Sequence, residues 1–401
     1  MEKIDLFSAT SVYSVACFFH FVRGFMASRR KRWNTWRHDR RAAWVVYIAL
    51  AVLLAALPFL AGGALGRGWV RILDFTLLYV MLALGLNIVV GYAGLLDLGY
   101  IAFYAVGAYL YALLASPHFG LHLPFWVLLP LGAGVAGLFG ILLGAPTLRL
   151  RGDYLAIVTL GFGEIIRIFL NNLNASVNIT NGPQGVNLID PIVIGGFSFS
   201  QPHTLFGVSF PGIYSYYYLF LVLTLLVIFV SLRLQNSRIG RAWVAIREDE
   251  VAAEAMGIDT RNIKLLAFAM GASFAGVSGG LFAGFQGFIS PESFNLFESI
   301  IVLCMIVLGG MGNIAGVILG AILITVFPEA LRYLGELQNL LFGRVFVDPA
   351  DLRMLIFGLA LVLVMIFRPA GLLPSVRRRR EFGSDSSVLA QEQASLYDSQ
   401  R

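Results

Sequence analysis

Charged residues are scarce in this chain, so those inside apolar stretches are the first candidates for a functional role. Only 13% of the residues are charged, while 58% are hydrophobic. Glu164 and Arg167 stand three residues apart in an apolar run and can pair on one helical face. An ion pair at membrane depth is costly unless it faces protein or water, which makes it a functional candidate. Alternatively, the pair lies at an outer helix end, with Arg167 reaching the interface.

Asp97 is a further candidate, at the centre of the glycine-rich segment Gly91–Gly99 (GYAGLLDLG). Gly and Asp favour tight turns, so this segment can simply be a turn between two apolar runs. It can also be a broken or re-entrant helix that lines a cavity, because irregular backbone at membrane depth is tolerated only there. Asp97, Glu164 and Arg167 are therefore candidates for a translocation pathway.

The segment Ser237–Lys264 is the longest patterned polar stretch inside the chain. It predicts a helix that ends at Gly257, with Asp259 or Thr260 capping the next helix. One stripe of this helix is charged and the opposite face carries small side chains. The stripe comprises Trp243, Arg247, Glu250 and Glu254, and the small face comprises Val244, Val251, Ala252 and Ala255. Such a helix suits docking into a groove on a soluble partner, and the alternative is a solvated loop whose charges only set topology.

The elements that carry these residues are predicted to be membrane helices. A mean hydropathy of +0.79 lies outside the range of soluble globular proteins. About ten apolar runs come near the roughly 20 residues that a bilayer requires. They are Ala42–Leu60, Ile72–Val90, Tyr100–Ala115, Pro124–Ala145, Tyr154–Leu170, Tyr214–Leu232, Ile263–Phe288, Phe297–Leu308, Ile314–Ala330 and Arg353–Phe367. The fold class is therefore all-α, a polytopic integral membrane protein. Asp5–Ala27 is either an extra span or an interfacial helix, and small residues in Gly271–Gly287 predict close helix packing.

The distribution of Lys and Arg predicts the orientation in the membrane. If the basic block at 29–41 is cytoplasmic, cytoplasmic segments hold 21 basic residues and outward loops hold five. This asymmetry predicts that both flanks of the membrane region are cytoplasmic. The expected parts are an extension at 1–41, a transmembrane region at 42–374 with a cytoplasmic loop at 233–263 and an outward loop at 171–213, and a polar tail at 375–401.

Motifs for covalent chemistry are missing from the sequence. None of the three lysines, Lys3, Lys31 and Lys264, follows a glycine, so no G-x-x-x-x-G-K-[ST] phosphate loop exists. The histidines and cysteines show no metal-ligand spacing, and no G-x-S-x-G elbow occurs. The basic residues lie in blocks beside apolar runs, which does not favour nucleic acid as a partner. The sequence predicts a non-enzymatic membrane subunit without cofactor or metal, so any ATP hydrolysis takes place on another polypeptide.

Several stretches between about Leu73 and Pro374 resemble the branched-chain amino-acid permease family, in its M-type subunit. They are GLNIVVGYAGLLDLGYIAFYAVGAYL, RLRGDYLAIVTLGFGEIIR, GRAWVAIREDEVAAEAMGIDTRNIKLLAFAMGASFAGVSG and SPESFNLFESIIVLCMIVLGGMGN. Asp97 is a departure, since many members carry a smaller or apolar residue there. The resemblance implies the ABC importer permease fold and ATP-driven import of leucine, isoleucine or valine across the bacterial inner membrane. Alternatives are a related importer of amides or urea, and a secondary transporter or channel.

The polar segment also resembles the cytoplasmic EAA-type loop of ABC-transporter membrane subunits. Glu250, Ala252, Ala253 and Gly257 stand in E-x-A-A-x-x-x-G order. By this resemblance, the ATPase-coupling residues are Arg247, Glu248, Glu250, Ala252, Ala253 and Gly257. The implied partners are a second, H-type permease, two cytoplasmic ATP-binding subunits, a periplasmic substrate-binding protein and the lipid bilayer.

Overall fold

The computed structural model describes two units of the chain. Its described residues are 40–64, 66–148, 150, 152–174, 178–205, 208–342, 358–359, 362, 366 and 371–373. The first unit is Met1–Gly66, of which the structure describes mainly one helix, α2 (Arg40–Ala64). The second unit is Arg67–Arg401 and contains all the candidate residues.

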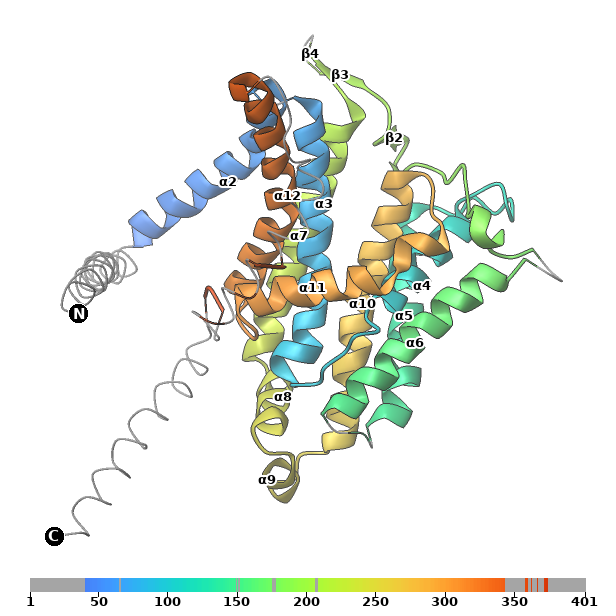
Figure 1. The fold of residues 1–401 in the computed structure, drawn as a ribbon, viewed down its shortest axis with the longest axis vertical. Helices are drawn as coiled ribbons and strands as arrows, with labels where there is room; N and C mark the ends of the chain where they lie inside the picture. The colour runs from blue at the N-terminus through green and yellow to red at the C-terminus, as the bar shows by residue number, and fades with distance from the viewer. Residues whose placement is uncertain are drawn as a thin grey trace, which may run out of the picture. The chain divides into compact units, whose positions relative to one another are not determined.

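The second unit is a bundle of helices joined by loops (Figure 1). In chain order they are α3 (Arg67–Leu86), α4 (Ile101–Leu114), α5 (Phe125–Thr147), α6 (Asp153–Asn172), α7 (Gly212–Asn236), α8 (Arg238–Glu248), α9 (Glu250–Ala255), α10 (Thr260–Gln286), α11 (Leu296–Gly309) and α12 (Ile314–Phe342). A π-helical turn, η1 (Asn87–Tyr92), continues α3 without a break. Two 3-10 turns, η2 (Gly182–Gln184) and η3 (Pro291–Phe294), lie in loops.

The helices coincide with nine of the ten predicted spans, which confirms the all-α membrane fold. Five described helical segments are long and apolar enough to cross a membrane: Arg67–Tyr92, Phe125–Thr147, Gly212–Asn236, Thr260–Gln286 and Pro291–Gly309. Ala51–Gly63, Ile101–Leu114 and Ile314–Ala330 are shorter apolar helices. The predicted span Arg353–Phe367, the segment Asp5–Ala27 and the tail lie almost wholly outside the described residues. The boundaries proposed at 42 and 374 stay predictions.

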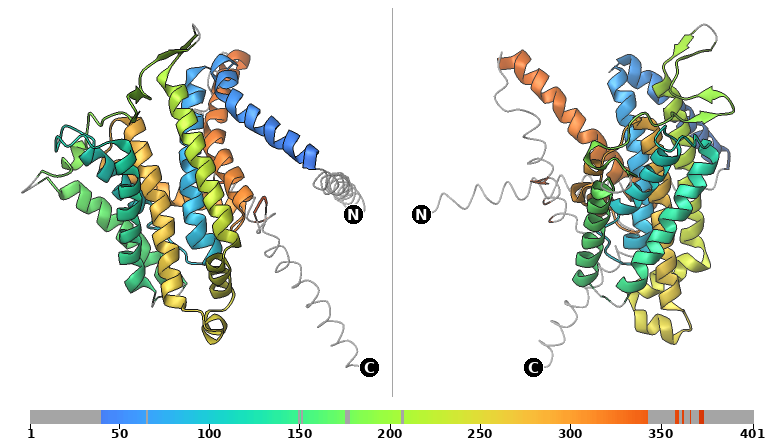
Figure 2. Two further views of the ribbon diagram at one scale, coloured as in Figure 1. Left: turned by 180° about the vertical axis from the view of Figure 1, so that it is seen from behind. Right: turned by 90° about the vertical axis from the view of Figure 1, so that its right-hand side faces the viewer.

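Helix α10 holds the bundle together through close backbone contacts. It packs against α3, α4 and α5, and both views of Figure 2 show it beside α5. A Cβ atom at Gly107 of α4 would lie only 2.2 Å from the carbonyl oxygen of Gly276. Likewise, a Cβ atom at Gly279 would lie 2.1 Å from the carbonyl oxygen of Tyr104. Small residues therefore bring these backbones into contact, as is typical of membrane helices.

The loop between α6 and α7 forms two short antiparallel strand pairs that the all-α prediction did not include. Strand β1 (Val193–Ile194) pairs with β2 (Phe197–Ser198), and β3 (His203–Leu205) pairs with β4 (Val208–Phe210). These strands lie at the opposite end of the bundle from α8 and α9 (Figure 1). The two main polar segments of the unit therefore emerge at opposite ends of the helices.

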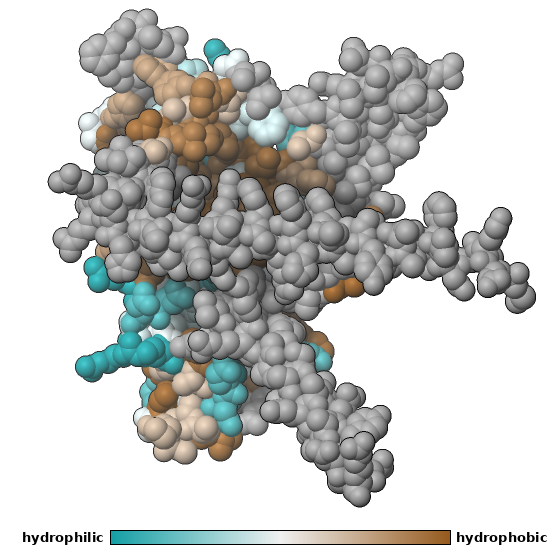
Figure 3. Space-filling model, turned by 90° about the vertical axis from the view of Figure 1, so that its left-hand side faces the viewer, coloured by the Kyte–Doolittle hydropathy of each residue, from teal (hydrophilic) through white to brown (hydrophobic). Residues whose placement is uncertain are grey.

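The hydropathy of the described surface also changes along the length of the bundle. On the face in Figure 3, apolar residues gather in the upper part and hydrophilic residues gather toward the end that carries α8 and α9. Large apolar side chains are exposed along the outer helices, among them Trp126, Leu138, Ile165 and Phe229. Such a surface suits hydrocarbon as its solvent, with the polar ends in water.

Candidate functional site

The polar segment after α7 forms two helices rather than the single helix predicted from its pattern. Helix α8 ends at Glu248, and Asp249 adopts an extended backbone conformation with φ −154° and ψ 112°. A carboxylate oxygen of Asp249 accepts hydrogen bonds from the backbone N–H groups of Val251 and Ala252, at 2.9 and 3.0 Å. This is an N-cap, which starts a new helix and ends the old one. The prediction of one continuous helix is therefore wrong, and the signal that it overlooked is Asp249 itself.

Because the helix breaks, the predicted charged stripe does not form. Trp243 is fully buried, and its Nε1–H donates to the carbonyl oxygen of Ile263 at 2.7 Å. Arg247 Nη1 donates to the carbonyl oxygen of Gly91 at 2.8 Å. Glu250 accepts from Lys264 Nζ at 2.5 Å. These side chains contact other parts of the same chain, which corrects the prediction that the stripe is a docking surface.

The end of this segment agrees with the sequence. Gly257 has a φ of +82°, the left-handed conformation that glycine adopts most readily, so its predicted role in ending the helix is confirmed. The N–H groups of Gly257 and Ile258 close the last turn by donating to carbonyl oxygens of Glu254 and Ala253. Asp259 caps α10 by accepting from the N–H of Asn262 at 3.1 Å.

Most of the surface that α9 and the following Met256 expose is apolar, with Glu254 as an exposed charged residue. Val251 is 67% exposed and Met256 is 84% exposed, at the tip of the bundle. Between them Ala252 and Ala255 are also exposed, whereas Ala253 is buried against the rest of the segment. We call Val251, Ala252, Ala255 and Met256 the α9 tip. Of the six coupling candidates, Glu248, Ala252 and Gly257 are exposed, Ala253 is buried, and Arg247 and Glu250 make the intramolecular contacts given above.

The segment Gly91–Gly99 is a partly buried break between two helices, longer than a tight turn. After η1, residues 93–100 have no helical structure, and Asp97 within them is 1% exposed. One carboxylate oxygen of Asp97 accepts from the N–H of Gly99 at 2.9 Å, and the other has no partner among the described residues. The N–H of Leu98 donates to Thr159 Oγ1 on α6 at 3.0 Å. Of the two interpretations from the sequence, the broken helix fits this geometry.

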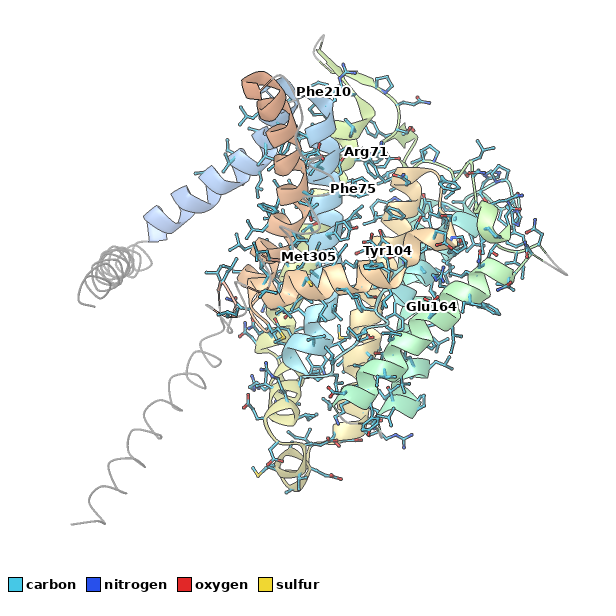
Figure 4. All side chains as sticks on the ribbon, in the orientation of Figure 1. Arg71, Phe75, Tyr104, Glu164, Phe210 and Met305 are labelled. Carbon is cyan, nitrogen blue, oxygen red and sulfur yellow. The ribbon has the colours of Figure 1, made fainter. Side chains whose placement is uncertain are left out.

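Glu164 and Arg167 do pair, and a third residue joins them. Arg167 Nε donates to Glu164 Oε1 at 2.9 Å, and Arg167 Nη1 donates to Glu292 Oε1 at 3.0 Å. The side chains of Arg167, Glu164 and Glu292 are 25%, 40% and 66% exposed. Glu164 lies midway along α6, and its label in Figure 4 is lower than those of Tyr104 and Met305. A role of this pair at membrane depth stays a prediction.

One of the candidate pathway residues, Glu164, lines a small hollow. It is lined by Leu98, Ile101, Leu160, Gly163, Glu164, Phe294 and Leu296. Leu98 follows Asp97 directly, so the break and the α6 ion pair meet at this place. In the part of the chain that the structure describes, no cluster of His, Cys, Asp and Glu could hold a metal ion.

Comparisons with known proteins agree with this architecture. Residues 68–365 match the family model described as branched-chain amino acid transport system / permease component. The chain belongs to this family. The high-affinity branched-chain amino acid transport system permease protein LivM of Escherichia coli (strain K12) is 46% identical over 342 residues, covering 82% of this chain and 75% of that protein. No solved structure matches the chain significantly.

Two more distant relatives extend the comparison. The permease protein BraD of Pseudomonas aeruginosa is 30% identical, covering 74% of this chain and 91% of that protein. The permease protein LivH of Salmonella typhimurium is 25% identical, with the same coverage of 74% and 91%. The family predicted from sequence motifs is therefore confirmed. Because relatives named both LivM and LivH match, the chain belongs to a transport system with a partner permease subunit.

Proposed function

We propose that this chain is the membrane-spanning permease subunit of an ATP-driven importer of branched-chain amino acids in the bacterial inner membrane. The observation that carries this proposal is the match of residues 68–365 to the branched-chain amino acid permease family, and the exposed apolar α9 tip supports docking of a partner. The chain has no phosphate loop, so a separate ATP-binding subunit supplies the energy. Two such subunits dock at the α8–α9 end, and a second permease completes the pathway.

The orientation of the permease in the membrane is inferred from the polar segments at its two ends. The basic residues favour the α8–α9 end on the cytoplasmic side, together with both flanks of the membrane region. The loop between α6 and α7, with its strand pairs, then faces the periplasm, where a substrate-loaded binding protein docks. ATP-driven closure of the ATP-binding pair moves α8 and α9, and this movement alternates access to the pathway.

The energetics of docking favour the apolar tip over charge pairing. Val251 and Met256 are largely exposed, so burying each in a groove contributes about 1.5–3 kcal/mol when burial is complete. Ala252 and Ala255 leave room for a partner's backbone to approach. Glu248 and Glu254 at the edge of this surface add polar contacts, while Arg247 and Glu250 hold the loop in shape.

Reconstitution tests the proposal directly. The permease, its partner permease, the ATP-binding subunits and the binding protein are placed in proteoliposomes, and uptake of radiolabelled leucine is measured. We expect ATP-dependent uptake that isoleucine and valine compete, whereas competition by acetamide or urea alone would indicate the related amide importer. Uptake by the permease without ATP-binding subunits would indicate a secondary transporter or channel.

Variants at the tip test the docking surface. Met256→Asp replaces an 84% exposed apolar side chain with a charge, so the fold is retained while the groove contact is lost. We expect the ATP-binding subunits to co-purify poorly and leucine uptake to fall. Met256→Leu keeps the apolar volume and is the matched control, which retains both. Parental co-purification and uptake in Met256→Asp would exclude the α9 tip as the docking surface.

A further inference from the structure

The end of α3 is an unusual place in the fold, where the coupling segment reaches the membrane helices. The last six residues of this helix, Asn87–Tyr92, form the π-helical turn η1, and all six are buried. Such turns are rare and occur frequently at functional sites. Because the chain leaves the helix after Tyr92, its last carbonyl groups need other donors. The carbonyl oxygen of Ile88 accepts from the N–H of Ala93, and that of Val89 accepts from the N–H of Leu95.

The carbonyl oxygen of Gly91 takes its donor from the coupling segment. Arg247 Nη1 on α8 donates to it at 2.8 Å, across a sequence separation of 156 residues. The arginine stem packs closely on the same turn, since a Cβ atom at Gly94 would lie 2.6 Å from Arg247 Cγ. One turn earlier on α8, Trp243 is buried in a cluster that includes Ile88 and Tyr92. Helix α8 therefore holds η1 through two side chains at i and i+4.

A second element holds η1 from another direction. The side-chain oxygen of Asn87 accepts from the N–H of Gly312 at 2.9 Å, in the turn between α11 and α12. The fit is tight, because a Cβ atom at Gly91 would lie 2.0 Å from that oxygen. The π turn is thus fixed between the coupling segment and the α11–α12 turn.

Beyond η1, the break leads to the hollow beside Glu164. The N–H of Leu98 donates to Thr159 of α6, and the N–H of Ile101 donates to Ser299 of α11 at 3.1 Å. Leu98 and Glu164 line the same hollow. A displacement of residues 93–100 therefore changes the contacts between α6 and α11 at this point.

We propose that residues 87–100 form the gate of the permease and that Arg247 is the positioning residue that connects this gate to α8. The inference rests on the proposed coupling of ATP hydrolysis to transport, and it assigns Arg247 to the inside of the permease instead of the docking surface. When a partner displaces α8, the Arg247 guanidinium carries the end of α3 with it. The break absorbs this displacement and opens or closes the hollow beside Glu164.

The test separates docking from transmission. In the reconstituted complex, Arg247→Ala is expected to retain the ATP-binding subunits and their ATP hydrolysis while leucine uptake falls at least about tenfold, a usual size for coupling between sites. Arg247→Lys keeps one donor for the Gly91 carbonyl and should give intermediate uptake. The matched control is Arg241→Ala, since Arg241 lies on the same helix and, among the described residues, its side chain donates to the nearby carbonyl oxygen of Asn236.

Variants at Gly94 test the same contact between Arg247 and residues 91–94. Gly94→Ala places a methyl group against the Arg247 stem and is expected to lower uptake without loss of the ATP-binding subunits. Gly94 has a φ of +72°, so an alanine there also strains the backbone. Combining it with Arg247→Ala removes the collision with the arginine stem but not this strain, so the loss of uptake in the double variant should be smaller than the product of the two single losses. If Arg247→Ala does not accumulate in the membrane, Arg247→Lys and Gly94→Ala carry the same test.

Two results would overturn the inference. Loss of the ATP-binding subunits in Arg247→Ala, as expected for Met256→Asp, would place Arg247 in the docking surface. A parental ratio of uptake to ATP hydrolysis in both Arg247→Ala and Gly94→Ala would show that the contact transmits nothing. Failure of the proposed function is distinct, because the parental complex would then show no ATP-dependent uptake of leucine.

Discussion

The ion pair between Glu250 and Lys264 can be tested by a double-mutant cycle. Glu250 Oε1 and Lys264 Nζ are 2.5 Å apart, and the Lys264 side chain is only 8% exposed. The pair joins the first residue of α9 to the first turns of α10. Removing the Glu250 carboxylate leaves a buried ammonium group without its partner, so α9 loses the contact that sets its position. We therefore expect Glu250→Gln to impair docking through Lys264.

The size of this effect follows from the burial of the two groups. Breaking a buried ion pair by removing one partner costs about 3–5 kcal/mol. Glu250 is 30% exposed, so water replaces part of the lost interaction. The lower range of about 1.5–3 kcal/mol for a hydrogen bond to a charged group is the better guide. If about half of this free energy reaches the docked state, affinity for the ATP-binding subunit falls by a factor of about four to about ten.

The assay measures the affinity of the ATP-binding subunit for detergent-solubilised permease in four variants. We expect Glu250→Gln and Lys264→Gln to weaken docking by similar factors, and the double variant to be no weaker than either one. Such non-additivity is the signature of residues that act through one contact. If Glu250 instead contacts the ATP-binding subunit, Lys264→Gln would be close to parental and the effects would add, which would refute the intramolecular role.

Three further predictions concern orientation, packing and charge. A reporter active only in the periplasm should be active when fused near Asn187 and silent when fused beside α9; the reverse would overturn the topology. Gly107→Ala should lower the thermal unfolding temperature, because its Cβ atom would lie 2.2 Å from a backbone oxygen, whereas Gly132→Ala, with its nearest atom at 3.6 Å, should not. Neutralising Glu164 or Arg167 alone should reduce leucine uptake more than exchanging the two charges, and parental uptake in both single variants would exclude a role in transport.

The membrane helices could be predicted from the sequence because a lipid bilayer provides no hydrogen-bond partners for the backbone. Every backbone group at membrane depth must find a partner in its own segment, so each long apolar run becomes a helix. Helix ends could also be predicted from the sequence where a single residue determines the backbone conformation. Gly257 adopts the left-handed conformation expected at a helix end, and Asp259 caps the next helix.

The break at Asp249 shows where this reasoning failed. A helical wheel assumes one continuous helix, but Asp249 satisfies two N–H groups of a new helix with its own side chain. The wheel therefore assigned Trp243 and Glu250 to one exposed stripe, although the first is buried and the second is bound to Lys264. An aspartate in front of a glutamate and small residues is a cap signal that outweighs the periodicity.

Contacts between distant segments had no signal in a single sequence. The sequence predicted the pair of Glu164 and Arg167 because helical spacing brings them together. The contact of Arg167 with Glu292 joins α6 to η3 across 125 residues, and it depends on how these elements pack. The contact of Arg247 with Gly91 likewise requires the π turn, whose hydrogen bonds leave no periodic pattern in the side chains.

The distribution of contacts in the coupling segment has a mechanical consequence. Its polar anchors, Arg247 and Glu250, bind inside the permease, while the α9 tip is apolar and free of such contacts. A partner that moves the tip must therefore move α8 and the start of α10 as well. Helix α10 is packed backbone to backbone against α4, so it resists local bending. We expect the displacement to be absorbed at least cost in residues 93–100, where no helical hydrogen bonds have to break and where Leu98 lines the hollow beside Glu164.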